Sequence, residues 1–370
     1  MSVTTFSFPT QVLFGSGVIS KLPAELERLG MRRPLVVTDS GFMNTAAFNH
    51  ILALVPGAVT FSGVVPNPTE ENVLQGIAKY RESGADSIIG VGGGSPLDAA
   101  KAIRLKTTHA LPLSEYDDNI GGSDKITNHM PPFVAIPTTA GTGSEVGRST
   151  VITMSATNRK TVIFSPHLIP NLAVADPDLT FDMPPAITAG TGMDAFTHNV
   201  EAYLSKGFHP ICDAIALGGA KIVYEHLPRV MRNARDAESR GQMMVAAMMG
   251  AIAFQKGLGA VHSLAHPLSS EFGMHHGTSN AVLLPAVLEY NREAAPERFA
   301  DLRRTLGKDV AECTRELNEI CGISPKLRDY GIPEEALPAL AEKAVEDGCH
   351  LLNPRSCDQA ALLELYRQSW

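Results

Sequence analysis

The sequence predicts a protein of two domains, an α/β domain followed by an all-helical domain. In the first half, short apolar runs alternate with helix-like segments, whereas the second half carries helical patterns and few β-branched runs. The 370 residues also exceed the size of about 250–300 residues at which single hydrophobic cores stop growing. We therefore expect an α/β domain at residues 1–180 and a helical domain at residues 181–370.

Five apolar runs are the candidate strands of the first domain: residues 34–38, 58–61, 87–91, 132–136 and 171–175. They are continuously apolar rather than alternating, which is typical of strands buried on both faces. Helical patterns such as 70–83 and 97–105 lie between them, and residues 6–17 read as a further strand and tight turn. This alternation predicts a parallel sheet covered by helices, and such sheets bind ligands at the carboxyl ends of their strands.

The pattern changes after Asp176-Pro177, and we place the domain boundary near Phe181. Pro184-Pro185 is typical of a helix start, because proline in the first turn costs no hydrogen bond. From there to Trp370 the periodicity is helical.

The composition excludes several classes of protein. A net charge of −8 argues against nucleic acid or an anionic membrane surface as the main partner. No apolar run approaches the roughly 18 residues of a membrane span, and no basic-then-apolar leader is evident at the start. Five cysteines without a CxxC pair read as reduced thiols. We expect a cytoplasmic protein.

Histidines concentrate in two segments of the second half. Asp194 and His198 are four residues apart, as are His262 and His266, so each pair shares one face of a helix. His276 follows in a glycine-containing segment. Three imidazoles and a carboxylate can close around a first-row divalent metal. The alternative is a set of unrelated, singly satisfied histidines, and two such pairs in succession favour the metal.

Two glycine-rich segments each follow a predicted strand. In the first, Gly92, Gly93 and Gly94 open a helix, where bare backbone and free N–H groups suit a pyrophosphate. It is not the GxGxxG fingerprint, so an ordinary turn is the alternative. The second, residues 137–145, combines flexible backbone with four hydroxyls, which suit ribose, phosphate or a nicotinamide amide. Both segments are expected at the same edge of the sheet.

Asp39 stands at the end of the strand at 34–38. A carboxylate there can accept hydrogen bonds from an adenosine ribose and would repel a 2′-phosphate, which favours NAD over NADP. The alternative is an aspartate that caps the following turn at Ser40-Gly41.

Taken together, the segments 92–98, 137–145, 192–198 and 262–277 resemble the iron-containing (group III) alcohol dehydrogenase family, with the resemblance extending from about residue 14 to residue 290. It implies a Rossmann-like nucleotide-binding domain, a helical metal-binding domain and an active site in the cleft between them. It also implies that Fe²⁺, or Zn²⁺, is held by Asp194, His198, His262 and His276. His266 matches the family's unligated histidine near the substrate, which makes it the candidate catalytic residue. The cofactor positions that we predict are Asp39, Asn67, Gly92, Gly93, Gly94, Ser95, Asp98, Thr138, Thr139, Thr142, Lys160 and Leu179.

Segments 253–259, 275–278 and 348–354 resemble the 4-hydroxybutyrate dehydrogenase branch of that family. Arg148 is of interest in this respect, because an arginine near the cleft can bind a substrate carboxylate bidentately. The alternative is a surface pair between Arg148 and Glu145.

The expected reaction is hydride transfer between NAD(H) and a small primary alcohol or aldehyde, with the metal as a Lewis acid. The substrate is 4-hydroxybutyrate with succinate semialdehyde, or a general short-chain alcohol or diol. A lyase of the related dehydroquinate-synthase type and a non-catalytic binding protein are alternatives. A metal-free reductase of the maleylacetate type is disfavoured by the complete set of four donors. We expect a homodimer or a larger homo-oligomer.

Overall fold

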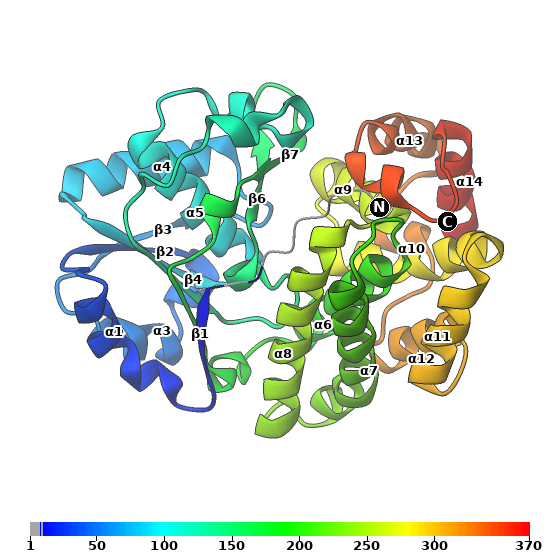
Figure 1. Cartoon of the computed structure of the whole chain (residues 1–370), viewed down its shortest axis with the longest axis horizontal. Helices are drawn as coiled ribbons and strands as arrows, with labels where there is room; N and C mark the ends of the chain where they lie inside the picture. The colour runs from blue at the N-terminus through cyan, green and yellow to red at the C-terminus, as the bar shows by residue number, and fades with distance from the viewer. Residues whose placement is uncertain (1–7, 9) are drawn as a thin grey trace. The chain divides into compact units, whose positions relative to one another are not determined.

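The computed structural model describes residue 8 and residues 10–370. Their contacts divide the chain into an α/β unit, residues 10–139 and 144–181, and a helical unit, which takes residues 182–370 together with the short segment Ala140–Gly143 (Figure 1). Part of the first strand predicted at 6–17 lies outside the described residues; the described part contains β1 (Gln11–Phe14).

The α/β unit is built on a parallel sheet of six strands in the order β1-β8-β5-β4-β2-β3. Its other strands are β2 (Pro34–Asp39), β3 (Val59–Val64), β4 (Ser87–Gly92), β5 (Phe133–Pro137) and β8 (Leu172–Ala175). Successive residues point to opposite faces, so Ile88 belongs to the core on one side and Ile89 to the core on the other. Both cores are apolar, which is why these strands read as continuous apolar runs. The predicted fold class is confirmed.

Helices cover both faces of the sheet. Figure 1 shows α1 (Leu22–Arg28) and α3 (Ala46–Ala53) on one side, and α4 (Glu70–Ser83) and α5 (Gly94–Thr108) on the other. The short α2 (Ser40–Met43) follows β2. A capping box between Thr69 and Asn72 starts α4, because each side chain accepts from the other's backbone N–H.

An antiparallel pair, β6 (Ser149–Met154) and β7 (Arg159–Phe164), was not predicted from the sequence. Its strands mix buried and partly exposed residues, as in the burial of alternate residues along β7. A search for continuous apolar runs selects strands buried on both faces and therefore passes over such a pair.

The helical unit comprises α6 (Pro185–Leu204), α7 (Pro210–Arg232), α8 (Ala237–Ala253), α9 (Ala260–Phe272), α10 (His276–Asn291), α11 (Pro296–Leu306), α12 (Val310–Ile320), α13 (Leu337–Val345) and α14 (Gln359–Ser369). Pro185 occupies the first position of α6, as expected. This helix is buried from Thr188 to Leu204 and packs against α7, α8 and α10. It is therefore the central helix of the unit.

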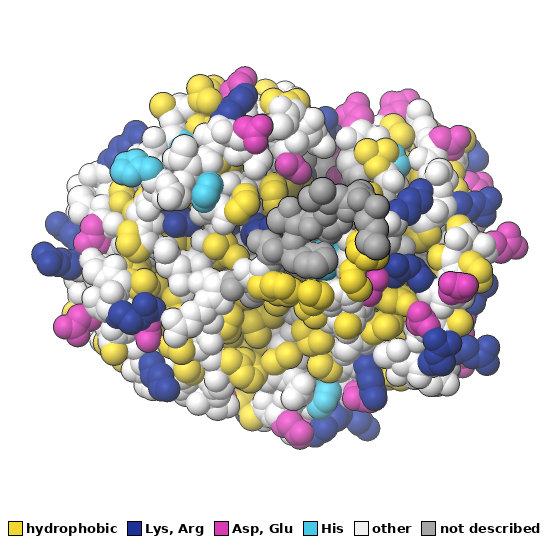
Figure 2. Space-filling view, in the orientation of Figure 1, with side chains coloured by type: hydrophobic (Ala, Val, Ile, Leu, Met, Phe, Trp, Pro, Cys, Tyr) yellow, Lys and Arg dark blue, Asp and Glu magenta, His cyan; other side chains and the backbone are white. Residues whose placement is uncertain are grey.

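The surface agrees with the acidic, mixed-charge composition. Lys and Arg side chains are interspersed with Asp and Glu side chains around the outer part of the face shown in Figure 2. Among the described residues, no single helix combines the length and hydropathy of a membrane span, and the bent pair Ala237–Lys256 and Ala260–Phe272 reaches that hydropathy only when joined.

Candidate metal centre and cofactor loops

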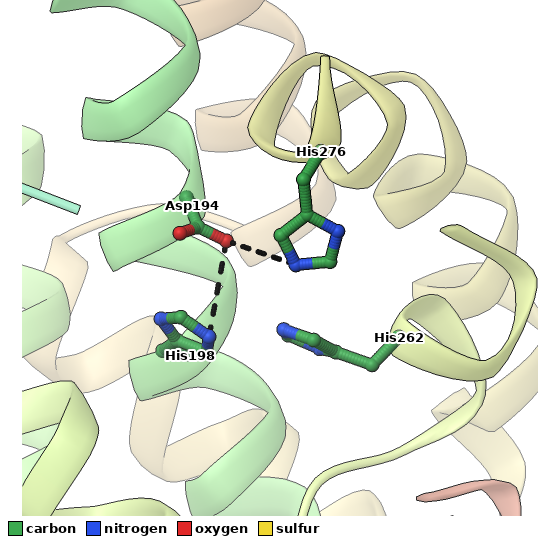
Figure 3. Close-up of side chains that lie close together, drawn as sticks. All are labelled: Asp194, His198, His262 and His276. Atoms are coloured by element: carbon green, nitrogen blue, oxygen red, sulfur yellow. Dashed lines mark ion pairs between the residues drawn. The ribbon is translucent and has the colours of Figure 1, made fainter. Parts of the chain in front are cut away.

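Four donor side chains from three helices converge inside the helical unit. Asp194 and His198 lie one turn apart on α6, His262 lies on α9 and His276 is the first residue of α10 (Figure 3). One donor atom from each lies within 4.8 Å of all the others. Asp194 Oδ1 is 3.8 Å from His198 Nε2 and 3.6 Å from His276 Nε2. The spacing of the sequence motifs thus becomes one compact group of donors.

Close packing of α10 on α6 is what brings His276 to Asp194. A Cβ atom on Gly277 would lie 2.0 Å from the carbonyl oxygen of Gly190 and 3.0 Å from the Cβ of Asp194. No side chain fits in that space. Glycine at 277 therefore lets the first turn of α10 rest directly on the backbone of α6.

Glu201 orients one of the histidines. Its Oε2 lies 2.5 Å from His262 Nδ1, and its Oε1 accepts a hydrogen bond of 2.7 Å from the backbone N–H of Val261. Burial opposes protonation of His262, but the hydrogen bond and charge of Glu201 outweigh it and raise the pKa of the imidazole. With Nδ1 engaged, Nε2 is the nitrogen that faces the other donors, an arrangement found in metal sites. Glu201 was missed, although it stands seven residues after Asp194 and so shares its helix face.

His266 does not enter this group of donors but lies beside it. Its ring stacks on that of His276, with centroids 5.3 Å apart. Its Nδ1 donates to Asp347 Oδ2 at 2.7 Å, and Asp347 Oδ1 accepts from Ser263 Oγ at 2.8 Å. Burial opposes ionisation of Asp347, yet its contacts with His266 hold the pKa of this carboxyl well below its ordinary value. Asp347 was also missed; it directly precedes a segment that carries the resemblance.

A second group of potential metal donors consists of His266, Asp347 and Cys349. The Asp347 carboxylate is already bound to His266, Ser263 and the backbone N–H of Cys349. These hydrogen bonds account for the arrangement of the group. The group of Asp194, His198, His262 and His276 differs from this second group, because its three imidazoles and one carboxylate are donors suited to Fe²⁺ or Zn²⁺. The residues at 194, 198, 262 and 276 therefore fit a divalent metal.

In the α/β unit, the first glycine segment forms the turn from β4 into α5. Gly92 has a φ of +143°, a conformation that favours glycine, and a Cβ there would lie 2.6 Å from Pro96. Gly93 is the N-cap of α5, and its missing Cβ would lie 3.1 Å from Thr139. Bare backbone thus precedes the N-terminus of a helix of 15 residues, as an anion site requires.

Several predicted cofactor positions gather around this turn. Ser95 Oγ accepts a hydrogen bond of 3.2 Å from the backbone N–H of Asn67, which has a left-handed φ of 56°. Thr138 directly follows β5, and its backbone N–H donates a hydrogen bond of 2.9 Å to the Gly92 carbonyl. Asp39 closes the neighbouring strand β2. These residues lie at the carboxyl edge of the sheet, as predicted. The other predicted positions are Lys160 on β7, Leu179 in the short helix Pro177–Thr180 and Thr142 in the segment Ala140–Gly143.

Asp39 is a helix cap in this structure. Its Oδ1 accepts a hydrogen bond of 2.8 Å from the backbone N–H of Phe42 and so starts α2. Its Oδ2 lies 3.5 Å from the position that a Cβ on Gly92 would take. The capping alternative is therefore realised, and the second oxygen is directed toward the glycine turn.

Asp98 supports the second glycine segment through its carboxylate. One oxygen accepts from Ser144 Oγ at 2.7 Å, and the other from the backbone N–H of Val151 at 2.9 Å. One turn along α5, Lys101 Nζ donates to Ser144 Oγ at 2.9 Å and to the carbonyls of Gly147 and Ser149 at 3.0 and 2.8 Å. Asp98 and the unpredicted Lys101 thus tie the chain after the loop to α5.

Burial changes the ionisation of this cluster. It lowers the pKa of Lys101 to about 8 and raises the pKa of Glu145 to about 7. Arg148, three residues after Glu145, places its guanidinium over the ring of Phe164 on β7, with 5.0 Å to the ring centroid. The structure thus gives Arg148 an aromatic partner that neither interpretation of the sequence included.

Comparison with known proteins decides the family. The family model described as "Iron-containing alcohol dehydrogenase" matches residues 9–177, and "Fe-containing alcohol dehydrogenase family, C-terminal" matches residues 188–370. The chain belongs to the iron-containing alcohol dehydrogenase family. The predicted resemblance is therefore confirmed, and with it an oxidoreductase that transfers hydride.

Relatives of this alcohol dehydrogenase cover its whole length. A 4-hydroxybutyrate dehydrogenase of Cupriavidus necator is 40% identical over 97% of this chain and 98% of the relative. A 1,3-propanediol dehydrogenase of Klebsiella pneumoniae is 38% identical, with complete coverage of both chains (100%). Because both relatives are dehydrogenases, the comparison favours an oxidoreductase over the lyase alternative.

Solved structures give the same result. A crystal structure of 1,3-propanediol oxidoreductase superimposes with a TM-score of 0.95 at 36% identity over 100% of both chains. A sulfoacetaldehyde reductase from Bifidobacterium kashiwanohense, solved in complex with NAD⁺, superimposes with a TM-score of 0.90 at 28% identity, covering 100% of this chain and 99% of the other. This iron-type alcohol dehydrogenase thus has relatives of the same fold along its whole length.

Proposed function

We propose that this alcohol dehydrogenase interconverts 4-hydroxybutyrate and succinate semialdehyde with NAD(H). The observation that carries the proposal is the 40% identity to a 4-hydroxybutyrate dehydrogenase over 97% of the chain. A short-chain diol dehydrogenase is the second candidate, because 1,3-propanediol dehydrogenases are 38% and 37% identical.

In this proposal, Asp194, His198, His262 and His276 hold Fe²⁺, and Zn²⁺ is an acceptable substitute because no redox change at the metal is needed. When bound, the ion supplies Lewis-acid stabilisation of the alkoxide that develops on the alcohol oxygen. The chain's contribution is to keep the four donors within 4.8 Å of one another and to orient His262 through Glu201.

His266 receives the proton of the alcohol at Nε2. Because Asp347 accepts the Nδ1–H of His266 at 2.7 Å, the lone pair of the neutral ring is on Nε2. Ser263 and the backbone N–H of Cys349 hold Asp347 in place. The carboxylate also stabilises the imidazolium that forms when the proton arrives.

NAD binds through backbone and hydroxyl groups of the α/β unit. The N-terminus of α5 and the turn at Gly92 and Gly93 receive the pyrophosphate, since bare N–H groups favour anions. Hydroxyls of Thr138 and Thr139 bind ribose, phosphate or the nicotinamide amide of the cofactor. The oxygen of Asp39 that does not cap α2 accepts from the adenosine ribose and repels a 2′-phosphate.

Arg148 binds the far carboxylate of 4-hydroxybutyrate. Its guanidinium lies over the ring of Phe164, and its planar N–H groups match the geometry of a carboxylate. Loss of one charge-assisted hydrogen bond of roughly 1.5–3 kcal/mol lowers kcat/KM by about 10- to 150-fold.

The experiment compares kcat/KM with NAD for 4-hydroxybutyrate, 1-butanol and 1,3-propanediol, in the wild type and in Arg148→Ala. We expect the hydroxy acid to be preferred, and only its oxidation to suffer from the substitution. A wild type that prefers 1,3-propanediol supports the second candidate instead. An equal loss on acid and butanol removes Arg148 from the substrate site and leaves the rest of the proposal standing.

The domain limits 1–180 and 181–370, the homo-oligomer and the cytoplasmic location stay predictions from the sequence. Sedimentation velocity on the purified full chain tests the oligomer, and a monomer would contradict it.

A further inference from the structure

Helix α10 brings a second polar residue to the metal-binding group. Asn280 follows His276 by four residues, so both project from the same face of the helix. The side chain of Asn280 is fully buried. Its Nδ2 donates a hydrogen bond of 2.8 Å to Asp194 Oδ1. The same nitrogen lies 3.3 Å from His276 Nε2 and 3.5 Å from His262 Nε2.

The amide nitrogen therefore touches three of the four candidate donors. An amide NH₂ is a donor without a lone pair for a cation, so Asn280 acts on the ligands and not on the metal. An imidazole Nε2 that binds a metal no longer accepts a hydrogen bond. Asp194 Oδ1, which has more than one lone pair, can serve the metal and Asn280 together.

The hydrogen bond selects which carboxylate oxygen faces the histidines. Asp194 Oδ1 is the atom within 3.8 Å of His198 Nε2 and 3.6 Å of His276 Nε2, and it is also the atom that Asn280 holds. A carboxylate without this contact is free to rotate about its terminal torsion, which is broad. Asn280 thus does for the carboxylate what Glu201 does for His262.

We propose that Asn280 is a positioning residue of the metal centre, which holds Asp194 Oδ1 in its ligating orientation and thereby strengthens metal binding. The inference rests on the proposed metal-dependent function. It assigns to α10 two tasks one turn apart, since His276 provides a ligand and Asn280 orients a ligand that belongs to α6.

The test measures the dissociation constant of Zn²⁺ for metal-stripped full-length protein, by competition with a chromophoric chelator. Asn280→Ala should bind Zn²⁺ about 10- to 100-fold more weakly, the usual effect of losing an outer hydrogen bond to a ligand. Asn280→Leu keeps the branched shape of the side chain without the donor and should show the same loss. The d–d absorption bands of the Co²⁺-substituted variants should shift, because the ligand field at Asp194 changes.

Asn318 provides the matched control. It is also a buried asparagine whose Nδ2 donates one hydrogen bond, of 2.7 Å, to the carbonyl of Ala281 on α10. Like Asn280, it has a buried Oδ1 without a hydrogen-bond partner among the described residues. Asn318→Ala should lower the melting temperature while the Zn²⁺ dissociation constant and the Co²⁺ spectrum stay as in the wild type.

The outcomes separate the two proposals. Wild-type affinity and spectrum in a folded Asn280→Ala or Asn280→Leu variant overturns the role of Asn280. Equal weakening by Asn318→Ala also overturns it, because the effect is then one of general packing. Wild-type affinity in His262→Ala contradicts the metal centre itself, and the inference falls with it.

Discussion

In the helical unit the candidate metal centre consists of side chains, four donors from α6, α9 and α10, whereas in the α/β unit the candidate cofactor site consists largely of backbone around Gly92 and Gly93. The metal centre depends on side chains that are present, whereas the cofactor site depends on the absence of Cβ atoms at its glycines. The two sites should therefore fail in opposite ways, one when a side chain is shortened and the other when a side chain is added. The following predictions test that contrast, from the largest expected effect to the smallest.

His262→Ala should abolish metal binding and lower kcat by roughly 10³-fold, because a bound metal supplies several kcal/mol of stabilisation to the transition state. Elemental analysis and steady-state kinetics measure both. The dissociation constant for NAD should stay within about twofold of the wild type. Full metal occupancy with unchanged activity would remove His262 from the site.

Asp347→Asn should lower kcat by about 10²-fold, the lower end of what a positioned acid or base contributes. The amide keeps the shape of the carboxylate but no longer selects the Nδ1–H form of His266 or stabilises its protonated form. Metal content, determined by elemental analysis, should equal that of the wild type. Loss of metal along with kcat would show that Asp347 supports the donors and not the proton transfer.

Gly93→Ala tests the backbone site. The added Cβ meets Thr139 at 3.1 Å and occupies space that a pyrophosphate needs, so the KM for NAD should rise by roughly 10- to 100-fold, equivalent to losing one or two hydrogen bonds to a charged group. Metal content should not change. The matched substitution is Gly30→Ala, at a glycine with open space around its missing Cβ. That variant should lose stability, because Gly30 has a φ of 70°, yet keep the KM for NAD.

Asp39→Gly should lower the preference for NAD over NADP, measured as the ratio of the two kcat/KM values, by roughly tenfold or more. The variant loses the hydrogen bond to the ribose of NAD and the repulsion of the 2′-phosphate of NADP, and together these effects amount to about 1.4 kcal/mol. The cap on α2 is lost as well, which glycine replaces at a cost of only a few tenths of a kcal/mol. Kinetics with both cofactors provide the measurement. Equal use of NAD and NADP by the wild type would contradict the assignment.

The sequence predicted a feature wherever all the residues that define the feature lie in one short segment. Asp194 and His198 share a helix face because they are four residues apart. The glycines between β4 and α5 indicate a turn, and this prediction does not depend on residues elsewhere in the chain. The strands were found because burial on both faces leaves a continuous apolar run. Each of these features depends on local geometry, which a periodicity of residues expresses directly.

Hydrogen bonds between residues far apart in the chain could not be predicted from the sequence. Asp347 meets His266 across 81 residues, and Asn280 meets Asp194 across 86. Which carboxylate or amide lies beside a histidine depends on how two helices pack. In the sequence, an isolated Asp or Asn on the surface cannot be distinguished from one in a functional site. The hairpin β6–β7 was missed for a related reason, since its half-exposed strands lack the apolar run of the central sheet.

By itself, then, the sequence indicated the α/β and helical halves, the pairs Asp194–His198 and His262–His266 and the glycine turn, because helix and strand periodicity and the conformational needs of glycine are local. Only the tertiary structure decided that Asp39 caps α2, that Asp98 and Lys101 contact the chain after the second glycine segment, and that Glu201, Asp347 and Asn280 contact His262, His266 and Asp194, respectively. The physical reason is that a hydrogen bond has a short range, whereas the residues that form these bonds are brought together only when the helices and strands pack.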